Sequence, residues 1–391
     1  MSSKLNSNLN ILFITENVSL GSHTEDLLDG IKIKSNLIKI INYYEVYQLG
    51  GYPQLEKSIY ESLRINKFDY LIIGLGTELL IDPFMICRLS NYFKLKVIII
   101  FPDPEHNFEF HDRYYAQCAD LCWAFSESMR GIFESYGYNF YSKQGFSVER
   151  YPRTNAAKDI NVSFIGGIDR ANRREYIDYL SENGVEVYLA GQGSKSGLVS
   201  VEEKNSIIAR SKIHLNFTRV ENGKLNIFKR LKQQKGRLVE VSLIGTFILT
   251  EDFGTSVKTI FNSTKYPVTF NSKSELLEKV RFYLRNDDVR ENLAAHAHIQ
   301  ALNYETFSVF SELIELANSN SFVEKKFIID NIFLHEWIGM RWFYFTKFLV
   351  KLKLKCALAE LKIIFKYFNF NLSFKIFTYS IPRGIFHGLF R

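Results

Sequence analysis

The stretch KGRLVEVSLIGTFILT (residues 235–250) decides the fold, because it joins a short helical pattern directly to a buried strand. Arg237 and Glu240 are three residues apart and therefore share one face of the predicted helix. The other positions are mostly apolar, and Gly245 is a typical residue to end such a helix before the β-rich run 246–250. Two interpretations of the charges are open: a structural ion pair, or a site for a charged, hydroxyl-rich ligand.

Similar apolar, β-rich runs occur on both sides of this stretch. They are continuous rather than alternating, which predicts parallel strands buried on both faces of a sheet. The runs are 10–15, 68–76, 96–101 and 121–126 in the first part of the chain, and 160–165, 185–190, 212–217 and 246–250 in the second. Polar loops and helical patterns separate them, so the sequence predicts α/β architecture throughout.

The periodicity disappears around residues 151–158, which indicates a domain boundary. A chain of 391 residues with 46% hydrophobic residues is long enough for two or three domains. We predict an acceptor-side domain over 1–150, a second α/β domain over 151–320, and a helical extension over 321–391. Two α/β domains in tandem create a cleft, which is the usual place for a ligand.

The net charge of +7 is concentrated in the extension. Residues 321–391 contain 12 Lys and Arg but 4 Asp and Glu, whereas the rest of the chain contains 37 and 38. This distribution argues against nucleic acid as a partner of the whole protein. Aromatic residues alternate with lysines in the extension, which is typical of a helix at an anionic membrane surface. A pair of helices packed on the first domain, with the lysines on the solvent-exposed face, explains the pattern equally well.

The four cysteines do not form a disulfide framework or a zinc motif at this chain length, and we predict no metal site. The N-terminus lacks the apolar core of a signal peptide. No stretch of ~18 uncharged apolar residues predicts a membrane span. We therefore expect a cytoplasmic protein, with peripheral attachment to the cytoplasmic face of the membrane if the extension binds lipid.

Several residues of the second domain suit a phosphorylated ligand. Gly166 and Gly167 follow a buried strand and precede a helix, so their backbone and the nearby Arg173 could hold a diphosphate. The carboxylate of Glu240 could accept two ribose hydroxyls, with Arg237 on the phosphates. Lys232 belongs to a basic cluster that could stabilise a diphosphate leaving group where no metal is used. A tight turn and a helix-start carboxylate are the structural alternatives for these residues.

In the first domain, His23 and Asp103 follow strand ends and could act as a general base toward a sugar hydroxyl. His106, His111 and Asp112 lie in the same loop region as Asp103 and could bind an acceptor or simply be solvated. No Walker-type phosphate loop is present, which disfavours an ATPase, and Gly166-Gly167 lacks the third glycine of the dinucleotide-binding fingerprint.

As an ordered series, the motifs of the second half resemble the CgeB-like (spore-maturation-type) glycosyltransferases, relatives of the group 1 glycosyltransferases. The motifs are VSFIGG (162–167) with Arg173, SKIHLNF (211–217), Arg237-x-x-Glu240 with GTFILT (245–250), SELLEKVRFYL (274–284) and RENLA (290–294). The resemblance implies a GT-B fold, in which two Rossmann-like domains face each other across a cleft. Residues 10–150 share it only by pattern.

The resemblance implies transfer of a sugar from a nucleotide diphosphate sugar to a glycan or lipid-linked acceptor, without a cofactor. It also implies that Glu240 contacts the ribose, that Arg237 contacts the donor phosphate or sugar, and that Gly166 and Gly167 line the donor loop. Lys232 stands where relatives often carry a second glutamate, which leaves the stereochemical course open. A nucleotide-sugar epimerase of the same shape and a non-catalytic nucleotide- or glycan-binding protein remain alternatives.

Overall fold

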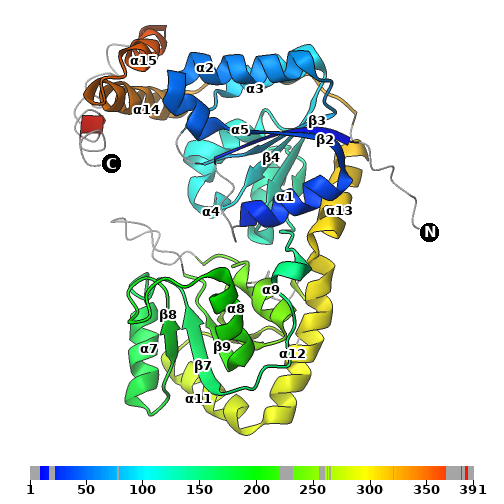
Figure 1. Ribbon diagram of the computed structural model, residues 1–391, viewed down its shortest axis with the longest axis vertical. Coiled ribbons are helices and arrows are strands. Elements are labelled where there is room, and N and C mark those ends of the chain that lie inside the picture. Colours follow the sequence, from blue (N-terminus) through cyan, green and yellow to red (C-terminus); the bar gives the residue numbers. More distant parts are fainter. Residues whose placement is uncertain are drawn as a thin grey trace.

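The computed structural model describes residues 9–16, 23–76, 79–219, 232–254, 260–261, 263, 266–319, 321–366, 380 and 384–385. Within these residues the chain forms two parallel sheets, one of six strands and one of five. Figure 1 shows them as two α/β domains stacked along the long axis of the molecule, with the C-terminal helices at the outer side of the first domain.

The first sheet has the strand order β2-β1-β3-β4-β5-β6. Its strands are β1 (Leu9–Thr15), β2 (Ser35–Asn42), β3 (Tyr70–Gly74), β4 (Lys96–Phe101), β5 (Leu121–Ala124) and β6 (Phe140–Tyr141). Its helices are α1 (His23–Lys34), α2 (Tyr43–Ile65), α3 (Pro83–Phe93), α4 (Pro104–Asn107), α5 (Arg113–Ala116) and α6 (Arg130–Ser135), with a π-helix at Phe108–Asp112.

Both faces of this sheet are buried, which explains the continuous apolar runs. Ile11 and Phe13 of β1 belong to a core formed with α1 and with α13 (Thr306–Ser319). Leu12 and Ile14 point the other way, into a core formed with α2, α3 and the C-terminal helices. Because successive side chains of a strand point to opposite faces, a strand covered on both sides must be apolar at every position.

The second sheet has the order β11-β10-β9-β7-β8. Its strands are β7 (Ile160–Ile165), β8 (Tyr188–Ala190), β9 (Ser211–Asn216), β10 (Phe247–Glu251) and β11 (Val268–Phe270). Its helices are α7 (Arg173–Glu182), α8 (Val201–Arg210), α9 (Arg237–Ile244), α11 (Lys273–Arg285) and α12 (Asp287–Ala301). The opening stretch is therefore α9 followed by β10, with Gly245 ending the helix in a left-handed conformation.

The chain crosses between the domains twice, near residue 146 and near residue 305. The two crossings are hydrogen-bonded to each other, from Phe146 N to Tyr304 O at 2.8 Å and from Thr306 N to Phe146 O at 3.0 Å. After the second crossing, α13 (Thr306–Ser319) packs its apolar face on the first sheet. The sequence placed these residues in the 151–320 segment, but their packing belongs to the first domain.

The C-terminal helices α14 (Asn331–Val350) and α15 (Leu354–Lys366) pack against α2 (Figure 1). Trp337, Tyr344 and Phe348 are buried in the core of the first domain, so the packed-helix interpretation describes α14. A fully buried ion pair, Arg341 Nη1 to Glu360 Oε2 at 3.3 Å, joins the two helices. None of the described helices is both long and apolar enough to span a membrane.

Candidate functional site

The carboxyl ends of both sheets contribute to one site between the domains. In each sheet the strand order reverses beside the first strand, between β1 and β3 in one and between β7 and β9 in the other. Ligands of open α/β sheets bind at such reversal points, outside the carboxyl ends of the strands. Gly166 follows β7 in the second domain, and Asp103 follows β4 in the first.

Two arginines converge on the turn after β7. The guanidinium carbons of Arg173 and Arg237 lie 5.7 and 5.6 Å from the ring centroid of Phe164. Arg173 Nη1 donates to the carbonyl of Gly167 at 2.9 Å. Gly166 has φ +152°, and a Cβ there would lie 3.3 Å from Arg237 Nη2. The glycine therefore leaves room for two positive groups to approach the backbone.

This turn also needs a second glycine. Gly191 follows β8 with φ +107°, and a Cβ on it would come within 2.6 Å of the carbonyl oxygen of Gly166. Gly166 N in turn donates to Ala190 O at 2.9 Å. The glycines after β7 and β8 thus allow two loops to lie back to back beside the arginines.

Lys235 adds a third positive charge to this cluster. Burial lowers its pKa, Asp103 opposes that effect, and the charges of Arg173 and Arg237 lower the pKa further. Burial also lowers the pKa of Arg237, with partial compensation from Glu240. Mutually repelling cations in a partly desolvated site are stabilised by an anion, so the cluster suits a phosphate group.

Glu240 lies one helical turn after Arg237, on α9. Its Oε2 pairs with Lys204 Nζ at 2.9 Å, and both side chains are about one-fifth exposed. No described residue forms a hydrogen bond with Oε1, which leaves that oxygen available to a ligand hydroxyl. Among the described residues, the ion pair of Glu240 is therefore formed with Lys204 and not with Arg237, and its Oε1 stays open to a ligand.

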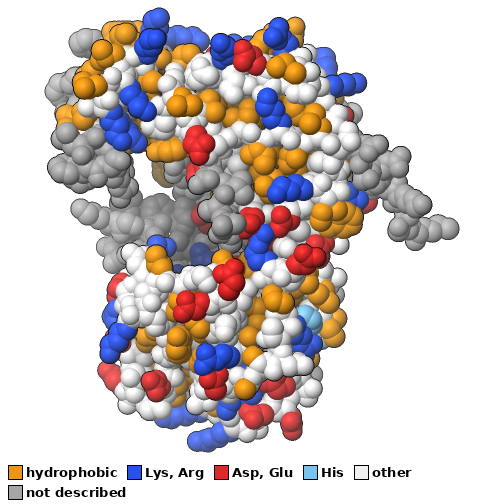
Figure 2. Space-filling view, in the orientation of Figure 1, with side chains coloured by type: hydrophobic (Ala, Val, Ile, Leu, Met, Phe, Trp, Pro, Cys, Tyr) orange, Lys and Arg blue, Asp and Glu red, His pale blue; other side chains and the backbone are white. Residues whose placement is uncertain are grey.

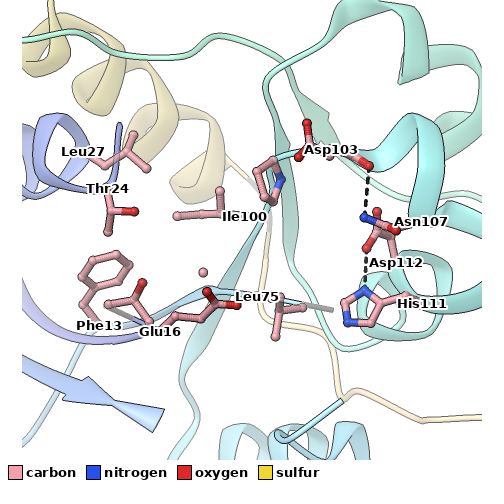
Figure 3. A pocket seen from close by; sticks show the side chains of 14 residues that line it. Phe13, Glu16, Thr24, Leu27, Leu75, Ile100, Asp103, Asn107, His111 and Asp112 are labelled. Atoms are coloured by element: carbon pink, nitrogen blue, oxygen red, sulfur yellow. Dashed lines mark hydrogen bonds and ion pairs between the residues drawn. The ribbon is translucent and has the colours of Figure 1, made fainter. Parts of the chain in front are cut away.

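The first domain contributes a cavity of about 370 Å³ at the ends of β1, β3 and β4. Figure 3 shows Glu16 and Thr24 on one side of this cavity and Asp103, Asn107, His111 and Asp112 on the other. Phe13, Leu27 and Ile100 form its apolar floor. The cavity thus combines apolar surface with carboxylates, as expected of a site for a hydroxyl-rich ligand.

Gln233 connects the two halves of the site. Its side-chain amide donates to Asp103 Oδ1 across the domain boundary and lies 3.3 Å from Glu105 Oε2. Lys235 Nζ donates to the Oε1 of the same Gln233. Burial raises the pKa of Glu105, an effect that hydrogen bonds from Ser126 and Ser128 oppose. The first-domain cavity and the cation cluster are therefore linked through one side chain.

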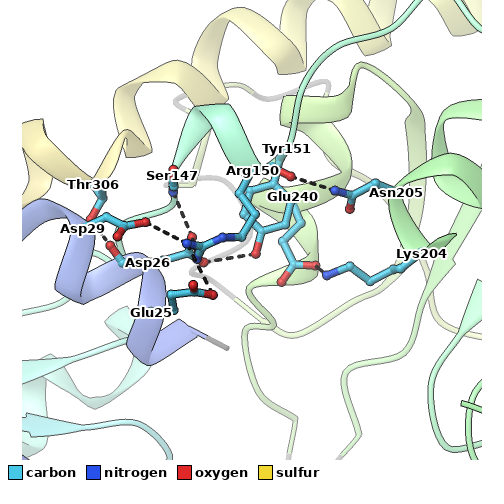
Figure 4. A network of polar contacts seen from close by, with 10 residues as sticks. All are labelled: Glu25, Asp26, Asp29, Ser147, Arg150, Tyr151, Lys204, Asn205, Glu240 and Thr306. Carbon is cyan, nitrogen blue, oxygen red and sulfur yellow. Dashed lines mark hydrogen bonds and ion pairs between the residues drawn. The ribbon is translucent and has the colours of Figure 1, made fainter. Parts of the chain in front are cut away.

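A second polar network lies at the domain crossings (Figure 4). Asp26 of α1 accepts from Arg150 Nη1 at 2.6 Å, from Tyr151 Oη at 3.1 Å and from the backbone of Ser147 at 3.1 Å. Burial raises the pKa of Asp26 to about 6, although these three partners lower it. The carboxylate of Glu240 also acts electrostatically on Asp26 and on Tyr151, so the network borders the candidate site.

The structure brings most of the predicted residues together. Gly166, Gly167, Arg173 and Arg237 form one cluster, with Glu240 one turn along the same helix and Asp103 reached through Gln233. His23 is the first residue of α1, and its side chain lies outside the described part of the chain, as does that of His106. Lys232 is partly exposed and pairs through its backbone with Arg219, next to residues 220–231, which are not described.

Other residues of the site were not predicted from the sequence. Lys204, Gln233 and Asp26 belong to no recognisable motif, and their roles depend on contacts with residues that are distant in the chain. For His111 and Asp112 the sequence left acceptor binding and solvation open; the structure buries both beside the first-domain cavity, so they are not solvated. The one local signal was their position, a few residues after the same strand end as Asp103.

Comparison with known proteins agrees with this geometry. Residues 170–309 match a family of proteins described as glycosyl transferase-like. The matched segment contains Arg173, Arg237 and Glu240. No curated protein sequence gives a significant match.

Solved structures show the same fold. HepE from Anabaena, in a complex with UDP and glucose, superposes with a TM-score of 0.58 at 14% identity, covering 80% of this chain and 100% of HepE. A glycosyltransferase from Rickettsia africae gives 0.56 at 11% identity, with 80% and 98% covered. Sucrose-phosphate synthase from Thermosynechococcus elongatus gives 0.56 at 8%, with 80% and 99% covered. The chain therefore has the predicted GT-B fold.

Proposed function

We propose that this protein transfers a sugar from a nucleotide diphosphate sugar to an acceptor hydroxyl. The observation that carries the proposal is the convergence of Arg173 and Arg237 on Gly166, in a cation cluster that Gln233 connects to the carboxylate-lined cavity of the first domain. A cation cluster suits a departing diphosphate, and a carboxylate suits the hydroxyl that replaces it. The order of motifs around this cluster supports a CgeB-like enzyme in particular.

The donor is a UDP-sugar bound mainly by the second domain. Its diphosphate lies against the arginines and the turn after β7, and the ribose hydroxyls donate to Glu240. The match over residues 170–309 supports this assignment because it covers Arg173, Arg237 and Glu240. HepE, which has the same fold, was solved with UDP-glucose and with UDP and glucose, and these complexes support uracil as the base of the donor nucleotide.

The chemistry needs only groups that are present in the chain. Asp103 accepts the proton of the acceptor hydroxyl, and the oxygen of that hydroxyl forms a bond to C1 of the donor sugar. The bond between C1 and the diphosphate oxygen breaks, and UDP leaves with the electron pair. Arg173, Lys235 and Arg237 stabilise the charge that develops on the leaving group, so no metal ion is required. Closure of the cleft excludes water and favours transfer over hydrolysis.

The acceptor is a glycan, in the form of a lipid-linked or surface polysaccharide made at the cytoplasmic face of the membrane. The outer surface of α15 supports this location. Every exposed residue in 351–366 is lysine, leucine or phenylalanine: Lys351, Leu352, Lys353, Leu354, Lys355, Leu358, Lys362, Phe365 and Lys366. Figure 2 shows hydrophobic and basic side chains interspersed over this region. We call these nine residues the α15 surface.

The α15 surface is presented by a firmly packed element. Glu360 of α15 is fully buried, where it accepts a hydrogen bond from Tyr47 and pairs with Arg341. Arg341 also donates to the carbonyl of Leu79 at 2.6 Å. A helix fixed in this way can present leucines to lipid and lysines to anionic headgroups, as interfacial helices do. The surface lies on the acceptor-side domain, where a lipid-linked glycan would arrive.

A panel of nucleotide sugars, each incubated with the full chain with and without oligosaccharide acceptors, tests the proposal. Acceptor-dependent release of nucleoside diphosphate is the expected result. Interconversion of the donor sugar without an acceptor would instead identify a nucleotide-sugar epimerase. Nucleotide binding with neither reaction would identify a non-catalytic binding protein.

A further inference from the structure

His111 and Asp112 form a buried pair at the wall of the first-domain cavity. The π-helix at Phe108–Asp112 places both side chains inward, with Nδ1 of His111 2.6 Å from Oδ1 of Asp112. His111 is 6% exposed and Asp112 is 4% exposed. Burial raises the pKa of Asp112, and the hydrogen bond with His111 opposes that effect. The imidazole also packs against the ring of Tyr115, which fixes its orientation.

The second ring nitrogen of His111 is left without a partner. Nε2 is shielded from solvent, and no hydrogen bond to it exists among the described residues. Buried polar atoms are usually paired, so an unpaired one beside a cavity marks a place where a ligand group can bind. When Nδ1–H of the neutral imidazole donates to the Asp112 carboxylate, the lone pair lies on Nε2, which then acts as a hydrogen-bond acceptor.

The charges of the cavity restrict what such a ligand can be. Glu16, Asp103 and Asp112 line it, and none of the described residues in its lining is Lys or Arg. The second-domain side of the site has the opposite character, with Arg173, Lys235 and Arg237 together. An anionic group would be repelled from the first-domain cavity, whereas hydroxyl or ammonium groups would find acceptors on its walls.

We propose that the first-domain cavity binds an uncharged or amino sugar ring of the acceptor, and that Nε2 of His111 accepts a hydrogen bond from one of its hydroxyls. The inference rests on the proposed transferase function and adds the chemical class of its acceptor. A phosphorylated sugar ring is excluded from the cavity. In a lipid-linked acceptor, the sugar end enters the cavity and the phosphates stay outside it.

Saturation-transfer NMR on the full chain tests this inference with four probes: methyl β-D-glucopyranoside, methyl β-D-galactopyranoside, glucosamine and glucose 6-phosphate. We expect transfer to at least one of the first three and little or none to glucose 6-phosphate. His111→Phe keeps an aromatic ring but removes both nitrogens. It should lower the affinity for the sugar about fivefold or more, as expected for one lost hydrogen bond. His111→Gln, which restores an acceptor near the position of Nε2, should recover part of the binding.

The matched control is His335→Phe. His335 lies on the exposed side of α14 and neighbours Glu336 much as His111 neighbours Asp112, but with 46% of its side chain exposed. This variant should bind the sugar like the wild type. Titration calorimetry with UDP should give the same affinity for the wild type, for His111→Phe and for His335→Phe, because UDP binds to the second domain.

Three outcomes would overturn the inference: no sugar probe binds to the wild type, glucose 6-phosphate binds as well as the neutral sugars, or His111→Phe binds sugar like the wild type. If His111→Phe does not fold, Asp112→Leu provides a second test, because it removes the acceptor that fixes the His111 tautomer at similar side-chain size. Failure of UDP to bind to the wild type would count against the proposed function itself, whatever the sugars do.

Discussion

The side-chain amide of Gln233, in the second domain, donates a hydrogen bond to Oδ1 of Asp103, in the first. This contact joins the end of β4 to the segment that leads into α9. It places the carboxylate of Asp103 between the first-domain cavity and the cation cluster, where acceptor and donor would react. It also leaves Oδ2 of Asp103 without a hydrogen bond to any described residue.

Replacing Asp103 by Asn should remove the proton acceptor but keep the contact with Gln233, because the Asn amide oxygen can still accept. We expect kcat to fall by a factor of about 10² to 10⁴, the usual range for a general base. UDP affinity and melting temperature should remain near the wild-type values. Kinetics with the best donor of the panel and calorimetry with UDP measure the two effects. A variant with undiminished kcat would show that another group takes the proton.

Glu240→Gln should weaken UDP binding by about tenfold or more, because a neutral amide replaces the carboxylate that accepts ribose hydroxyls. The variant also loses the ion pair with Lys204, so its folding must be measured in parallel by thermal unfolding. Glu278→Gln, at an exposed position of α11, is the control for a charge change in the same domain. If Glu240→Gln lowers stability but each folded molecule binds UDP as before, the ion pair with Lys204 is the whole role of Glu240.

Asp26 makes stability depend on pH in a defined direction. Its pKa is about 6 in the folded chain and near 3.8 without burial, so the folded state binds more protons between these values. The free energy of unfolding should therefore fall as the pH rises from about 4 to about 6, by roughly 2–3 kcal/mol from this group. Urea unfolding of the wild type and of Asp26→Asn across this range measures the difference. Parallel curves for the two proteins would contradict the assignment.

Reversing charges on the α15 surface should release the protein from anionic membranes. Lys355→Glu with Lys362→Glu changes the net charge by four units on exposed side chains. Because each basic residue near an anionic surface contributes about 1 kcal/mol, sedimentation with phosphatidylserine liposomes should fall at least tenfold. Lys195→Glu with Arg285→Glu makes the same change on exposed positions of the second domain and should sediment normally. Equal sedimentation of the two double variants would rule out the α15 surface as the membrane contact.

The sequence predicted those elements whose environment is uniform along the strand. The predicted strand 96–101 agrees with β4, because that strand is buried on both faces and its apolar run from Val97 to Phe101 is unbroken. β2 was missed because it is the edge strand of the first sheet, where most positions are only half-buried and Lys39 and Asn36 interrupt the run. Periodicity also indicates helices without indicating their partners. The apolar face of α13 therefore gave no sign that it packs on the first domain.

The residues of the candidate site also form two groups: those that local sequence features indicate, and those whose contacts depend on the packing of distant elements. Gly166, Arg237 and Glu240 could be predicted because a turn after a buried strand and the first turn of a helix are local features. The pairing of Glu240 with Lys204, and of Asp26 with Arg150, depends on how distant elements pack. The burial of His111 depends on a π-helix, whose extra residue per turn has no clear sequence pattern.

The paired crossings near Phe146 and Glu305 limit how the two domains can move relative to each other. A single linker would leave two domains free to rotate and slide, but two connections held together by main-chain hydrogen bonds remove most of those degrees of freedom. The domains can swing about the line through the crossings, while a sliding displacement would break the bonds between them. A hinge movement of this kind would therefore return the cation cluster and the first-domain cavity to the same relative position.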